Sequence, residues 1–187
     1  MVIVGLSISE RELAAILLIA SMAVFVPGGI LFTGRAMWKW PVGQTPAFLR
    51  WERGFVVAAL LVGVLGLVLL AQLLSTAGHT TLAQLALVTY LIGATVLVVA
   101  EMTYLHNREW VYPQVVLYVV LAFLAQAAFG VALLQTSLVA PWVGWVTIGW
   151  NLAWLVLLAI ASPRNMYFPA LHHVAPLIIG IALLASS

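Results

Sequence analysis

The sequence predicts an all-α fold: a polytopic integral membrane protein built as a six-transmembrane-helix bundle with both termini on the outer face. Hydrophobic residues make up 65% of the 187 positions and charged residues only 6%, whereas a soluble domain carries about 25% charged residues. Six apolar runs each approach the roughly 20 residues with which a helix crosses a hydrocarbon core of about 30 Å. The runs are residues 13–32, 55–74, 82–105, 115–134, 141–161 and 168–185. Because they are continuously apolar, without the alternation of barrel strands, the spans are predicted to be helices.

The first run, residues 13–32, is expected to be retained as a membrane helix. No basic segment precedes it and no small-residue cleavage site follows it, so it lacks the features of a cleaved signal peptide. The link that follows, residues 33–50, contains Trp38 and Trp40. We expect their indole rings at headgroup depth, because tryptophan is enriched where membrane meets water.

Positive charges gather at one end of the predicted bundle. Six of the seven Lys and Arg residues lie in or beside alternate links, and only Arg11 lies at the other end. The six are Arg35, Lys39, Arg50, Arg53, Arg108 and Arg164. By the positive-inside rule these links are cytoplasmic, which places both termini on the outer face. The links are short, so residues 1–187 are predicted to form a single domain.

Glu101 is the leading candidate for a functional residue, because an ionisable side chain within a membrane helix costs about 2.5–3.5 kcal/mol on insertion scales. It lies about one turn inside the cytoplasmic end of the third predicted helix, with Tyr104 one turn further on. If Arg53 lies within salt-bridge distance, we expect a charged Glu101 and a pair that fixes helix packing. If no cation approaches, we expect a protonated Glu101 beside a water-accessible cavity.

Further titratable side chains are expected at the same cytoplasmic end. Glu52 opens the second predicted helix, where a carboxylate suits the positive end of the helix dipole, and a solvated cap is the simpler account of it. His106 follows the third helix, and His172 and His173 lie in the first turns of the sixth, near the headgroup boundary. Imidazoles from different helices can ligate a metal ion or haem. Hydrogen bonding at the interface is the simpler account of these histidines.

Asn151 lies near the middle of the fifth predicted helix, where lipid offers no hydrogen-bond partner. Thr147 is on the same helix face. We expect Asn151 to be buried between helices and bonded either to a ligand or to Gln126 or Gln135 of the fourth helix.

The composition favours a membrane protein without catalytic machinery. The chain has no cysteine, and no nucleophile, base and orienting group can be assembled by spacing. We therefore expect an accessory or structural subunit of a membrane complex, or a module that binds lipid or another hydrophobic ligand, with no cofactor. Membrane lipid and other membrane subunits are the expected partners, and the scarcity of cations excludes nucleic acid. In general appearance the chain resembles small polytopic bacterial membrane proteins, which implies the cytoplasmic (inner) membrane of a bacterium.

Two alternative functions stay open. A proton-coupled or small-solute transporter would use Glu101 and the cytoplasmic histidines, with helices kinked at Pro27 and Pro176. It lacks a second ionisable residue at the midplane to complete a proton relay. A membrane redox protein would hold haem through the histidines, and a Soret band in the spectrum of the purified protein would identify it.

Overall fold

The computed structural model describes residues 8–108, 111–161 and 171–186. This part of the chain is all-helical, without strands, and confirms the predicted helical membrane bundle. Its elements are α1 (Glu10–Ala36), the 3-10 turn η1 (Pro41–Gln44), α2 (Pro46–Thr76), α3 (Thr80–Asn107), α4 (Tyr112–Leu134), α5 (Pro141–Ala161) and α7 (Val174–Ala185).

Five of the described helices, α1 to α5, are long and apolar enough to cross a membrane. The chain is therefore a multi-pass helical membrane protein. The sixth, α7, has 12 residues and extends about 18 Å at 1.5 Å per residue, less than the thickness of a hydrocarbon core of about 30 Å. The described part of the predicted run 168–185 is helical from 171 to 185 apart from a turn at 173, and residues 168–170 lie outside the described residues, so a full sixth span stays a prediction.

The second helix also differs from its prediction, because α2 begins at Pro46 and the apolar run begins only at residue 55. Thr45 caps this helix: its side chain accepts a hydrogen bond from the backbone N–H of Phe48 at 3.3 Å. Pro46 occupies the first turn, where its missing N–H costs nothing. The hydropathy pattern predicted the apolar part of α2 from residue 55 and missed the two helical turns that precede it.

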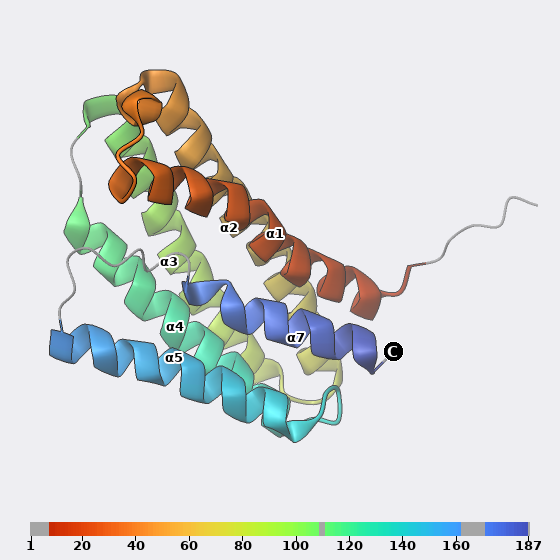
Figure 1. Ribbon diagram of the computed structural model, residues 1–187. Helices are drawn as coiled ribbons and strands as arrows, with labels where there is room; N and C mark the ends of the chain where they lie inside the picture. Colours follow the sequence, from red (N-terminus) through yellow and green to blue (C-terminus); the bar gives the residue numbers. More distant parts are fainter. Residues whose placement is uncertain (1–7, 109–110, 162–170, 187) are drawn as a thin grey trace, which may run out of the picture.

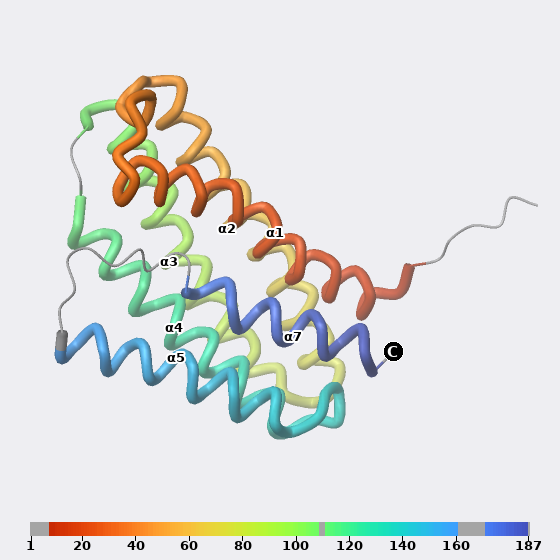
Figure 2. Tube along the Cα trace, in the orientation of Figure 1, coloured from red at the N-terminus to blue at the C-terminus, as the bar shows by residue number. Residues whose placement is uncertain are grey.

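Consecutive long helices lie side by side, and α7 returns against α1 and α5, so that the bundle closes on itself (Figures 1 and 2). Small residues allow the closest approaches. A side-chain carbon added at Gly180 of α7 would lie 2.8 Å from the carbonyl oxygen of Ala15 on α1. Gly130 on α4 and Gly144 on α5 approach each other in the same way.

The first described turns of α1 and the end of α7 meet at one end of the bundle. Arg11 donates to the carbonyl oxygens of Leu183 at 3.1 Å and Leu138 at 2.7 Å, and to the hydroxyl of Ser186. This cation satisfies one carbonyl in the last turn of α7, where positive charge is favourable, and one in the link between α4 and α5. The structure thus places both described ends together, and the side of the membrane on which they lie stays a prediction.

Candidate functional site

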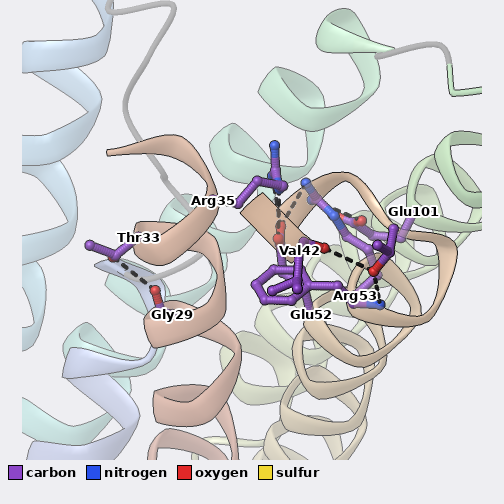
Figure 3. A network of polar contacts seen from close by, with 9 residues as sticks. Gly29, Thr33, Arg35, Val42, Glu52, Arg53 and Glu101 are labelled. Carbon is purple, nitrogen blue, oxygen red and sulfur yellow. Dashed lines mark hydrogen bonds and ion pairs between the residues drawn. The ribbon is translucent and has the colours of Figure 1, made fainter. Parts of the chain in front are cut away.

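Four charged side chains form a continuous chain of ion pairs across three helices at the opposite end of the bundle (Figure 3). Arg35, in the last turn of α1, binds both carboxylate oxygens of Glu52 on α2, at 2.7 and 2.8 Å. Arg53 lies 3.1 Å from Glu52 and donates to both carboxylate oxygens of Glu101 on α3, at 3.1 and 3.2 Å. Two positive and two negative groups alternate, so the formal charge of the chain is zero.

The chain lies inside the protein. Glu52, Arg53 and Glu101 are 0%, 2% and 1% exposed, and the side chain of Arg35 is 14% exposed. Removing one partner from a buried pair leaves an uncompensated charge and costs about 3–5 kcal/mol. These contacts therefore fix α1, α2 and α3 relative to one another.

Glu101 lies within salt-bridge distance of Arg53, the first of its two predicted outcomes. The guanidinium of Arg53 also lies over the ring of Tyr104, 4.7 Å from its centroid, a cation–π contact. Tyr104 thus belongs to the same group of residues as Glu101. Both carboxylate oxygens of Glu101 accept from Arg53, which supports the interpretation of this pair as a contact that fixes helix packing.

The prediction of a solvated cap at Glu52 is wrong. Because α2 begins at Pro46, Glu52 lies in its second turn instead of at its end, and it is fully buried against α1. Sequence reasoning missed Arg35 as its partner. A usable signal was present, because a carboxylate beside a membrane-spanning run needs a cation at the same depth and Arg35 follows the neighbouring run.

The predicted interfacial position of His172 and His173 is also wrong. They are 2% and 1% exposed and lie inside the bundle, at the start of α7. The Tyr118 hydroxyl of α4 lies 2.8 Å from Nε2 of His172, and the Gln126 side chain donates to the His172 carbonyl at 2.9 Å. The end of α7 lies beside Arg11, near the start of α1. Because α7 is short, its first residues reach only part of the way along α1, and this places His172 and His173 inside the bundle (Figure 1).

The ring of His173 packs between two aromatic neighbours. Its centroid lies 3.9 Å from that of His172 and 4.8 Å from that of Phe25 on α1. Its Nε2 atom has no hydrogen-bond partner in the described chain, nor does Oε1 of Gln126. His106, in the last turn of α3, is exposed and apart from this buried pair, so the three histidines do not form the predicted cytoplasmic cluster.

The structure does not bring the candidate metal ligands His106, His172 and His173 together into one ligand set. Within residues 8–108, 111–161 and 171–186, no group of three or more His, Asp or Glu side chains is arranged to hold a metal ion. The two buried imidazoles stack on each other, and one is bonded to Tyr118.

Asn151 is fully buried, as predicted. Its side-chain N–H donates to the carbonyl of Thr147 on its own helix at 2.7 Å, instead of bonding to Gln126 or Gln135. Its Oδ1 has no partner among the described residues. Asn151 therefore contributes no described interhelical hydrogen bond.

Comparisons of the chain with protein-family models, curated proteins and solved structures give no match.

Proposed function

We propose that the protein is a non-catalytic accessory or structural subunit of a membrane complex, located in the cytoplasmic membrane of a bacterium with the ion-pair chain on the cytoplasmic side. The observation that supports this proposal is the unbroken series of ion pairs from Arg35 through Glu52 and Arg53 to Glu101. It matches each of its buried charges with an opposite one.

A proton carrier needs an acid that can release its proton to water. Glu101 is 1% exposed and both of its carboxylate oxygens accept from Arg53. Releasing it from this pair would leave a buried guanidinium without its carboxylate, at a cost of several kcal/mol. The residue that best motivated transport is therefore better suited to holding helices together.

The outward faces of the helices also support a subunit role. Large apolar side chains are exposed on several of them, including Leu85 at 61%, Trp145 at 65% and Ile160 at 79%. In a membrane such faces contact acyl chains or other apolar helices. A rigid bundle with apolar flanks can serve as a packing partner for other membrane subunits.

Native mass spectrometry of protein extracted from its own membrane tests this proposal. We expect a fixed stoichiometric assembly with other membrane subunits, and no proton flux above that of empty liposomes when the purified chain is reconstituted. A single unassembled chain whose proton flux disappears in Glu101→Gln would overturn the proposal.

A second candidate, proton-coupled or small-solute transport, is favoured by one observation. Helix α7 begins inside the bundle beside His172 and His173, and half-length helices that start at a buried polar site are a recurring feature of transporters. Solute flux that His173→Phe abolishes while the fold is retained would establish this candidate over the first.

A further inference from the structure

A pocket of about 570 Å³ opens where α1 ends and η1 begins. It lies at the same end of the bundle as the ion-pair chain, which contributes one of its residues. It is lined by Arg35, Ala36, Lys39, Trp40, Pro41 and Gln44.

Close backbone contacts hold two walls of the pocket in place. The Trp40 ring lies directly on Gly34 and leaves no room there for a side-chain carbon. The backbone N–H of Trp40 donates to the carbonyl of Gly34 at 2.9 Å and closes the turn. Arg35 is held by Glu52 on one side and packs against Gly43 on the other. The pocket is thus preformed, which lowers the entropy cost of binding.

The pocket carries a positive charge that no carboxylate of the described residues pairs with. The charge of Arg35 is matched by Glu52, whereas no carboxylate of the described residues forms a salt bridge with Lys39. Lys39 is the sole lysine of the sequence. It has a φ of 51°, a left-handed conformation that is uncommon for a residue other than glycine and is found at ligand-binding positions.

The depth of the pocket identifies its surroundings. Trp38 and Trp51 are 61% and 67% exposed on the same end of the bundle, and exposed tryptophans of a membrane protein lie at the level of the lipid headgroups. The pocket therefore opens where phosphate groups are concentrated.

The polar groups that line the pocket are mainly donors. Lysine and arginine offer only N–H donors, and the glutamine amide and the indole add further N–H groups. An anion with several acceptor oxygens matches this set, and phosphate is the anion that lysine and arginine commonly bind. We propose that the pocket around Arg35, Lys39, Trp40 and Gln44 binds a phosphate group, supplied by the headgroup of an anionic phospholipid or by free phosphate.

The single lysine allows a direct test in the intact protein. The chain is reconstituted into nanodiscs of phosphatidylcholine with or without phosphatidylglycerol, neither of which has a primary amine, and is acylated with an uncharged amine-reactive ester. Peptide mass spectrometry follows the label on Lys39. The reference is the amine introduced by Arg50→Lys, an exposed site on the same end that does not line the pocket.

We expect phosphatidylglycerol to slow acylation of Lys39 about fivefold more than acylation at position 50, the fold-change that corresponds to about 1 kcal/mol, the net contribution of one hydrogen bond from the pocket to the phosphate. Protection by phosphatidylglycerol alone identifies a lipid headgroup as the ligand. Equal protection by millimolar inorganic phosphate in phosphatidylcholine nanodiscs identifies free phosphate. Equal labelling of both amines under all conditions would overturn the site.

Native mass spectrometry supplies a second measurement. In Lys39→Gln the affinity for phosphatidylglycerol or phosphate should fall about fivefold relative to wild type, while Arg50→Gln retains it. If the two variants lose the ligand equally, the surface binds by net charge alone and the pocket is not a site.

Discussion

Arg53 on α2 and Glu101 on α3 are bound to each other at 3.1 Å inside the bundle, although 48 positions separate them in the sequence. Both are almost completely buried, and Arg53 also contacts Glu52. The strength of this pair decides between a structural and a proton-carrying role for Glu101.

Glu101→Gln should lower the stability of the protein by about 3–5 kcal/mol, because it leaves the Arg53 guanidinium buried without its carboxylate. Thermal unfolding in detergent measures this loss. Glu10→Gln, at an exposed carboxylate of α1, is the matched control and should change stability by less than about 0.5 kcal/mol.

The double variant Arg53→Met with Glu101→Leu should be less destabilised than the sum of the two single variants, because no unpaired charge remains between α2 and α3. Glu52 keeps Arg35 as its partner in that variant. Additive losses would show that the pair has no coupling energy.

Gly180→Ala should destabilise the contact between α7 and α1. The added carbon would lie 2.8 Å from the carbonyl oxygen of Ala15, and overpacking of this kind costs about 1–3 kcal/mol. Gly149→Ala is the control, since nothing lies within 4 Å of the carbon added there. If both variants lowered the unfolding temperature equally, the loss would come from replacing glycine by alanine in general and not from the close contact between α7 and α1.

The two buried histidines should respond differently to replacement by phenylalanine. His172→Phe removes the hydrogen bond between the imidazole and the Tyr118 hydroxyl, a loss of about 1 kcal/mol. His173→Phe keeps the ring stack with Phe25 and removes an Nε2 atom that lacks a described partner, so stability should be unchanged or higher. A larger loss in His173→Phe would show that its Nε2 is hydrogen-bonded in the membrane.

Reporter fusions test the orientation of the bundle. Fusions after Gly78 and Val139 should report the outer side, and a fusion in the 35–44 segment should report the cytoplasm, because cations concentrate at that end. A cytoplasmic signal after Gly78 would reverse the topology and would place the Arg35 end of the bundle outside.

The spans of α1 to α5 were predictable because apolar runs of about 20 residues have few alternatives to a membrane helix. The true start of α2 could not be predicted from hydropathy, because hydropathy reports only which residues contact lipid. The helix begins at the Thr45 cap and already includes the polar residues Arg50 and Glu52 before its apolar part. Local capping chemistry, visible as Thr45 followed by Pro46, was the signal that could have extended it.

The candidate site was predictable in part. The sequence offered Arg53 as one possible partner of Glu101 beside a protonated, unpaired carboxyl, and the structure shows the Arg53 contact. The depth of His172 and His173 could not be read from the sequence, because an apolar stretch gives no sign of where along its neighbours a short helix begins. That position depends on tertiary contacts such as Arg11 at the end of α7.

The ion-pair chain also constrains the order in which the protein can be built. Removing one partner from a buried ion pair costs about 3–5 kcal/mol, and Arg53 gains its second carboxylate only after α3 has been synthesised. The α2 and α3 segments should therefore leave the translocon together, as a hairpin that carries Arg53 and Glu101 already paired. A ribosome stalled before Glu101 should hold α2 in contact with the insertion machinery, and synthesis past that residue should release it.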